Sequence, residues 1–270
     1  KYHKMRGITS MRTLTAGFTA LILMTISAVA ADWPQFQGPN RDGTSPETGI
    51  ARDWPVEGPK ELWSVRLSPG YGGPAIHSGE VFLLDREKHT TDILRCIDLE
   101  SGKERWTFEH ESPGSTGHPG SRTPPTVDDE AVYVVGLMGD FYCVDRKSHT
   151  LRWHINLVMD YGVKLPNWGI AQAPLLYENL VIVAPQADDA YLVAFDKKTG
   201  KEVWKSEGLG LPGYASPSIV TLGGVQQVVV LSASTKDGDS MSTVAGLALD
   251  TGKMLWTYEG WYCKIPIPYP

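Results

Sequence analysis

Short apolar runs that alternate with polar residues, separated by tight turns, occupy most of the chain. Between residues 172 and 205 four such runs follow one another, at 172–177, 180–184, 191–195 and 202–205. Each run has a length typical of a β-strand, and the intervening residues include the Asn, Asp and Gly that favour turns. The pattern therefore predicts an antiparallel sheet of four short strands in this part of the chain.

A tryptophan recurs at the end of each comparable stretch. The five tryptophans are Trp63, Trp106, Trp153, Trp204 and Trp256, spaced 43, 47, 51 and 52 residues apart. A period in the forties with four strands per unit is typical of a β-propeller, in which each blade is a twisted sheet that buries both faces against its neighbours. The sequence therefore predicts an all-β propeller of four-stranded antiparallel blades.

Four of these tryptophans end a similar phrase. The third phrase, from Ala194 to Trp204, contains Asp, Thr and Gly at positions that suit a hairpin turn. It resembles the tryptophan-docking motif of alcohol dehydrogenases that depend on pyrroloquinoline quinone (PQQ) and of PQQ-like repeat proteins, and the resemblance extends from Trp33 to the end of the chain. It implies that each tryptophan stacks between adjacent blades.

The other repeats depart from this phrase in detail. Cysteine replaces alanine at Cys96 and Cys143, His149 replaces the glycine of the turn, and the fourth phrase, 248–256, is shorter by two residues. Equivalent positions on adjacent sheets lie about 10 Å apart, which is beyond the reach of a disulfide. We therefore expect buried free thiols at Cys96 and Cys143, and Cys263 is left unpaired.

The number of repeats indicates how much of a propeller is present. Residues 32–270 form the predicted propeller domain, with four complete blades and an incomplete fifth blade at 261–270. The complete blades are predicted to end near Trp106, Trp153, Trp204 and Trp256. The resemblance implies a ring of about eight blades, within the range known for propellers. We therefore expect a truncated sequence with an open sheet edge and poor solubility.

Residues 1–31 are predicted to be an upstream extension followed by a secretory signal peptide. Arg12 precedes an apolar run at 14–29, and the small residues at 28–30 form an A-x-A cleavage pattern. An N-terminal membrane anchor is the alternative, but polar residues dilute the run and it ends in the cleavage pattern. The sequence therefore predicts a periplasmic or secreted protein with no stable membrane anchor.

The charge of the chain limits the partners to be expected. The whole sequence has a formal charge of −6, and residues 1–31 contain four basic residues and no acidic one, so the remainder carries −10. Nucleic acids and anionic lipids bind clusters of Lys and Arg, which this acidic sequence does not offer. A protein or small-molecule ligand at the propeller face is expected instead, and nucleic acid is not.

Candidate ligand-binding residues are predicted from the points at which the blades begin. A dipeptide that ends in proline opens each predicted innermost strand, and the residues just before these dipeptides would surround the mouth of a central channel. Arg and Lys there would suit an anionic ligand such as a quinone carboxylate. Solvated loop residues are the alternative interpretation. The candidates are Tyr71, Arg122, Gln172, Tyr214 and Lys264.

Two functions remain open from the sequence. The first is a non-catalytic binding or scaffold propeller, for which no cofactor is predicted. The second, implied by the resemblance, is an alcohol or sugar dehydrogenase with PQQ, Ca²⁺, a catalytic Asp and often an adjacent pair of cysteines. The chain has no adjacent cysteine pair, its seven His residues are scattered, and we predict no metal site. Since function is argued from a site, the sequence favours the scaffold.

Overall fold

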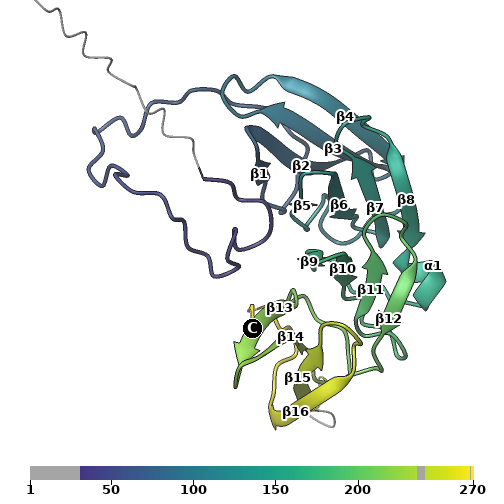
Figure 1. Cartoon of the computed structure of the whole chain (residues 1–270). Helices are drawn as coiled ribbons and strands as arrows, with labels where there is room; N and C mark the ends of the chain where they lie inside the picture. The colour runs from purple at the N-terminus through teal and green to yellow at the C-terminus, as the bar shows by residue number, and fades with distance from the viewer. Residues whose placement is uncertain (1–30, 236–240, 268) are drawn as a thin grey trace, which may run out of the picture. The chain divides into compact units, whose positions relative to one another are not determined.

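The computed structural model describes residues 31–235, 241–267 and 269–270 (Figure 1). The predicted extension and signal peptide, 1–31, lie outside this part of the chain except for residue 31. Among the described residues, no helix combines the length and the apolar character needed to cross a membrane. Their regular structure is almost entirely β-strand, which confirms the all-β prediction.

The described strands form four antiparallel sheets of four strands each, numbered here as blades 1 to 4 in chain order. Strands that follow one another along the chain are neighbours in every blade, as expected for strands joined by hairpins. Blade 1 consists of β1 (Ala75–His77), β2 (Glu80–Glu87), β3 (Thr91–Asp98) and β4 (Glu104–Glu111). Blade 2 consists of β5 (Thr126–Val127), β6 (Ala131–Val135), β7 (Asp140–Asp145) and β8 (Leu151–Asn156).

The second half of the described chain repeats this order. Blade 3 consists of β9 (Leu175–Tyr177), β10 (Leu180–Val183), β11 (Val193–Asp196) and β12 (Glu202–Lys205). Blade 4 consists of β13 (Ser218–Leu222), β14 (Val225–Leu231), β15 (Ser242–Ala248) and β16 (Met254–Trp261). A five-residue helix, α1 (Leu157–Tyr161), follows β8, because the Asn156 side chain accepts the Met159 amide hydrogen and caps its start.

The hydrophobic core is divided among the interfaces between consecutive blades. Blade 2 shows this best, since alternate residues of β6 face opposite sides. Val132 and Val134 belong to the cluster shared with blade 1, whereas Tyr133 and Val135 belong to the cluster shared with blade 3. A third cluster joins blades 3 and 4. Each sheet is therefore buried on a face that only its neighbour covers, as expected for propeller blades.

Trp63, Trp153 and Trp204 contact the turn of the blade that follows each of them. Their indole nitrogens donate hydrogen bonds to turn carbonyls, from Trp63 to Leu99 (2.9 Å), Trp153 to Lys197 (2.9 Å) and Trp204 to Leu249 (3.0 Å). The indole rings also cover the turn glycine. A Cβ added to Gly252 would lie 2.3 Å from the Trp204 ring, so the contact requires glycine there.

His149 replaces the turn glycine in blade 2 and retains its conformation. Its backbone φ is 60°, in the left-handed region that the equivalent Gly200 occupies at 69°. Its imidazole stacks on Trp106, with ring centroids 4.7 Å apart and planes 14° from parallel. The junction between blades 1 and 2 therefore substitutes a ring stack for the packing of indole against glycine.

Gly252→Ala is expected to lower the free energy of unfolding by about 2–3 kcal/mol, because the new methyl group meets Trp204 and the backbone is strained. Gly223→Ala is the matched control, since its φ of 58° is similar but no atom lies within 4 Å of the added Cβ. Backbone strain alone predicts a loss of about 1 kcal/mol there. Urea unfolding measures both, and equal losses would contradict a steric role for the docked indole.

The fourth repeat keeps the full length of the motif, so the predicted loss of two residues is wrong. Gly246, rather than Ala248, lies opposite Trp256, in the position that Ala194 holds opposite Trp204. Ala248 instead occupies the turn position at which the other repeats have aspartate, and its carbonyl accepts the same hairpin hydrogen bond. The prediction aligned Ala248 with Ala194 because each precedes an aspartate by two residues. Strand pairing shows that Gly246 is the equivalent residue.

Cys96 and Cys143 are buried free thiols, as predicted. They lie opposite Trp106 and Trp153 in their sheets, where the third repeat has alanine. Burial raises the pKa of each thiol to about 12, so both are uncharged at neutral pH. Cys263 is also a free thiol and is half-buried.

The segments before blade 1 and after blade 4 form backbone hydrogen bonds with residues at or near the blades. Trp33 exchanges two backbone hydrogen bonds with Ile76 of β1, of 2.8 and 2.9 Å. Within the predicted incomplete fifth blade, Trp261 is the last residue of β16, and no further strand is described after it. The carbonyl of Pro266 then accepts a hydrogen bond from the Tyr214 amide at 3.0 Å. The first flanking segment therefore lies beside β1, and the second lies beside the loop that precedes β13.

The turn aspartates stabilise their hairpins as carboxylates. Asp196 accepts hydrogen bonds from the Thr199 hydroxyl and amide at 2.8 Å each, which lowers its pKa below the ordinary value. Bonds from Ser101 and Arg105 likewise lower the pKa of Asp98, and bonds from Ser148 and Arg152 lower that of Asp145. Both side chains are half-buried. These hydrogen bonds and ion pairs stabilise the fold only while the three carboxyl groups are ionised.

Stability is therefore expected to fall in acid. Each carboxyl has a folded-state pKa below its unfolded value, so its contribution is present above about pH 4 and is lost as the pH falls through the folded-state pKa. Urea midpoints measured between pH 6 and pH 3 should show this decline. The triple variant Asp98→Asn, Asp145→Asn, Asp196→Asn should have a shallower decline, and an unchanged slope would contradict this role of the turns.

Candidate functional site

A cavity of about 550 Å³ opens where the loops before the first strands of the blades come together. Tyr71 comes from the loop before β1, Arg122 from that before β5, Trp168 from that before β9, and Tyr214 from that before β13. The full lining is Phe36, Tyr71, His118, Arg122, Pro124, Trp168, Ala171, Tyr214, Ser216 and Ile267. Its size and its mostly aromatic and apolar wall are typical of small-ligand sites.

Arg122 supplies positive charge to this wall. Its guanidinium donates to the carbonyls of Gly120 (2.8 Å) and His118 (2.7 Å) and lies 5.1 Å from the Tyr71 ring centroid. Burial lowers the pKa of Arg122 from its ordinary value, although a guanidinium stays charged at neutral pH. These hydrogen-bond partners are neutral oxygens, so the charge remains available to an anion.

Trp168 and Tyr214 form the opposite part of the wall. Their ring centroids are 5.0 Å apart, and the Trp168 amide donates to the Tyr214 hydroxyl at 3.4 Å. Beneath them, the buried Gln172 amide donates to Gln186 at 2.9 Å and to the Gly213 carbonyl. Gln186 also accepts the Gly213 amide hydrogen at 2.9 Å. This buried pair of amides fixes the backbone that carries Tyr214.

The structure brings together three of the five candidates predicted from the repeat. Tyr71, Arg122 and Tyr214 all line the cavity. Gln172 is buried below it, because an offset along the chain does not give the direction of a side chain. Lys264 is exposed and is not among the lining residues. Trp168 was missed, since it lies further from its strand than the offset that the prediction used.

The lining chemistry suits an organic anion and does not fit a calcium ion. Ca²⁺ takes about 6–8 oxygen ligands, usually including Asp or Glu carboxylates. None of the described residues that line the cavity is Asp or Glu. Arg122 and the aromatic rings suit instead a planar or apolar group that carries a carboxylate. The Ca²⁺ implied by the resemblance to dehydrogenases therefore does not fit this cavity.

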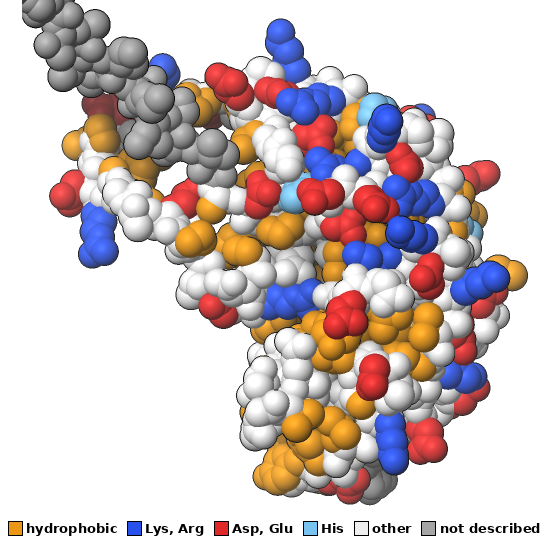
Figure 2. Space-filling view, viewed as in Figure 1, with side chains coloured by type: hydrophobic (Ala, Val, Ile, Leu, Met, Phe, Trp, Pro, Cys, Tyr) orange, Lys and Arg blue, Asp and Glu red, His pale blue; other side chains and the backbone are white. Residues whose placement is uncertain are grey.

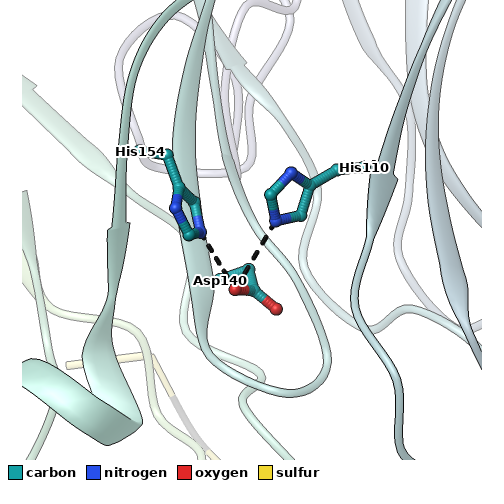
Figure 3. A group of neighbouring side chains, drawn as sticks. All are labelled: His110, Asp140 and His154. Atoms are coloured by element: carbon teal, nitrogen blue, oxygen red, sulfur yellow. Dashed lines mark hydrogen bonds and ion pairs between the residues drawn. The ribbon is translucent and has the colours of Figure 1, made fainter.

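A second group of polar side chains lies at the boundary between blades 1 and 2. His110 comes from β4, Asp140 from β7 and His154 from β8. Nε2 of His154 lies 2.9 Å from Asp140 Oδ1, and Nε2 of His110 lies 3.6 Å from the same oxygen. Figure 3 shows both imidazoles directed at this carboxylate. No motif in the sequence indicates this group, because its residues meet only when the two blades pack together.

Asp140 is held firmly in this group. The Ser112 hydroxyl donates to Asp140 Oδ2 at 2.5 Å, and the Asn156 side-chain amide donates to Oδ1 at 2.9 Å. Burial opposes ionisation, but the bonds from His110, His154 and Ser112 outweigh it and hold the pKa of Asp140 well below its usual range. The carboxylate is therefore charged at neutral pH and fixed in orientation.

Charged side chains of both signs are interspersed over the face seen in Figure 2. Elsewhere in the blades Arg95 pairs with the buried Asp85 of the neighbouring strand (3.0 Å), and Arg146 of blade 2 pairs with Glu80 of blade 1 (2.7 Å). These cations are therefore compensated by neighbouring carboxylates, unlike the guanidinium in the cavity.

A family model described as outer membrane protein assembly factor BamB matches residues 56–154 and 89–260. The serine/threonine-protein kinase AfsK of Streptomyces griseus is 26% identical over 167 residues, which are 60% of this chain and 19% of that protein. The quinoprotein ethanol dehydrogenase of Pseudomonas aeruginosa is 26% identical over 158 residues, which are 56% of this chain and 24% of that enzyme. The chain thus matches only a minor part of each relative.

A solved structure confirms the fold. The quinohemoprotein alcohol dehydrogenase from Comamonas testosteroni superposes on 84% of this chain with a TM-score of 0.61, and 41% of that enzyme is covered. The two sequences are 16% identical over the match, so the likeness concerns the fold alone.

Proposed function

The chain belongs to the family described as outer membrane protein assembly factor BamB, and on this basis we propose that it is an exported, non-catalytic scaffold that binds a segment of a partner protein. The cavity between the blades carries the proposal. Each blade contributes a loop to it, its walls are aromatic, and Arg122 is bonded only to neutral oxygens. A peptide with neighbouring acidic and aromatic side chains matches these features.

The second candidate is a dehydrogenase that uses PQQ and Ca²⁺. The similarity to a protein named quinoprotein ethanol dehydrogenase favours it, as does the planar, anionic character of PQQ. The lack of a carboxylate among the described lining residues disfavours it, because nothing in the wall replaces the oxygen ligands of Ca²⁺. The scaffold therefore accounts better for the residues of this cavity.

Binding of a model peptide tests the scaffold. A fluorescein-labelled peptide of alternating glutamate and phenylalanine is expected to raise fluorescence anisotropy with the full chain, and a lysine–phenylalanine peptide is not. Arg122→Gln should weaken the first interaction at least about tenfold, equivalent to about 1.4 kcal/mol. Arg66→Gln, at an exposed position outside the cavity lining, is the matched control and should bind as the unmodified chain does.

Reconstitution tests the alternative. PQQ and Ca²⁺ are added to the full chain, followed by an alcohol and an electron-accepting dye. Quinone absorbance that stays with the protein, together with dye reduction, would overturn the scaffold. Peptide binding that depends on Arg122, without dye reduction, supports it. Equal binding of both peptides, or no effect of Arg122→Gln, would remove the cavity as the binding site.

A further inference from the structure

We propose that His110, Asp140 and His154 bind a zinc ion that links blades 1 and 2. One ligand atom from each residue can be chosen so that all three atoms lie within 4.8 Å of one another. Zn²⁺ is bound tetrahedrally by imidazole nitrogen and carboxylate oxygen at about 2.0–2.2 Å, which separates neighbouring ligand atoms by about 3.4 Å. The distances of 2.9 and 3.6 Å from Asp140 Oδ1 to the two Nε2 atoms lie on either side of this value.

The surroundings of Asp140 are those of a ligand whose orientation is fixed. Bonds from Ser112 and Asn156 hold the carboxylate without adding a cation to the group. Ligating carboxylates in metal sites are supported in the same way by neighbouring hydrogen bonds. The two imidazoles lie beside each other, with ring centroids 4.5 Å apart. Each directs its Nε2 atom at the carboxylate. Little movement is therefore needed to admit an ion.

The ligand set selects the metal. Two imidazole nitrogens favour Zn²⁺ and related transition metals over Ca²⁺ and Mg²⁺, which prefer oxygen. Three protein ligands leave one tetrahedral position unfilled, and the His154 side chain is 29% exposed, so solvent reaches the group. A water molecule completes the coordination. The site therefore has the open form, with one exchangeable position, rather than the closed form of four protein ligands.

Zinc at this position would stabilise the fold. His110 belongs to blade 1, and the other two ligands belong to blade 2, so the ion binds both sheets at once. An ion that binds only the folded protein raises stability by mass action. The midpoint temperature of unfolding is therefore expected to rise when zinc is added to the metal-free chain.

Calorimetric titration of the full chain, freed of metal with a chelator, tests the proposal. One equivalent of ZnCl₂ should bind, and Co²⁺ should give the visible absorption bands of a tetrahedral site. His154→Gln and His110→Gln should each weaken zinc binding by at least about tenfold and remove the thermal shift. His89→Asn is the control, because His89 is exposed and lies outside the group. Ser112→Ala should weaken binding about tenfold by releasing the carboxylate.

The outcomes separate a metal site from a purely hydrogen-bonded group. Saturable binding that both histidine variants lose and His89→Asn retains supports the proposal. An unmodified chain that binds no zinc, or two histidine variants that bind as tightly as it does, would overturn it. Circular dichroism reports whether each variant folds, and His154→Gln alters the most exposed ligand, so its result stands if His110→Gln does not fold.

Discussion

Replacing Trp204 with alanine is expected to lower the free energy of unfolding by about 3–5 kcal/mol. The indole is 7% exposed and packs in the cluster that joins blades 3 and 4. Its nitrogen also donates to the Leu249 carbonyl, which would lose this donor at a buried interface. Urea unfolding followed by far-ultraviolet circular dichroism measures the loss.

Trp256→Ala is the matched control, because the same residue of the motif has a different environment in blade 4. Its indole nitrogen donates at 2.5 Å to Gln227 of its own blade, and the ring is half-buried. A loss of about 1 kcal/mol is expected. If the two variants lost the same stability, the docking of Trp204 on the next blade would not be the source of its effect.

The second large effect is expected at a buried ion pair in blade 1. Arg86 and Asp92 are 1% and 0% exposed, and Arg86 Nη1 lies 2.5 Å from Asp92 Oδ1. Arg86 also donates to the carbonyls of Ser112 (2.6 Å) and Gly114 (2.8 Å). Arg86→Met leaves the carboxylate without its cation, and the expected loss in the free energy of unfolding is about 3–5 kcal/mol.

A double variant separates the cost of an unpaired charge from the value of the pair. Arg86→Met combined with Asp92→Leu removes both charges, and apolar replacement of a buried pair is often close to neutral. Urea unfolding should show more than half of the lost stability restored, with the remainder lost at the carbonyls of Ser112 and Gly114. A double variant no more stable than Arg86→Met would contradict this account.

The blade architecture could be predicted from the sequence because its signals are local. Alternation within 172–205 gave the strands of blade 3, and the spacing of tryptophans gave the number of sheets in the described chain. The turn phrase ending at Trp204 needed only the conformational preference of Gly200 and the side-chain bonds of Asp196. Each of these preferences depends on residues that are close together in the sequence.

The features that the sequence did not predict depend on contacts between separate segments. His110 and His154 come together at Asp140 only when two sheets pack against each other. The spacing of these residues along the chain therefore does not predict the group. The prediction placed Gln172 correctly in the loop before a first strand. Its side-chain amide nevertheless points away from the cavity, because it donates to the buried Gln186. The position of Ala248 was misjudged because pairing across the hairpin, rather than the similarity of letters, decides the register.

The tryptophan docking gives the described chain a direction. Blade 2 receives Trp106 on its own turn and presents Trp153 to blade 3, which in turn presents Trp204 to blade 4. Blades 2 and 3 thus each receive an indole on one side and present an indole on the other. A whole blade duplicated between two others would meet a matching surface on both sides, whereas a cut within a blade would separate its turn from its tryptophan. The natural unit for inserting or removing sequence is therefore the complete blade.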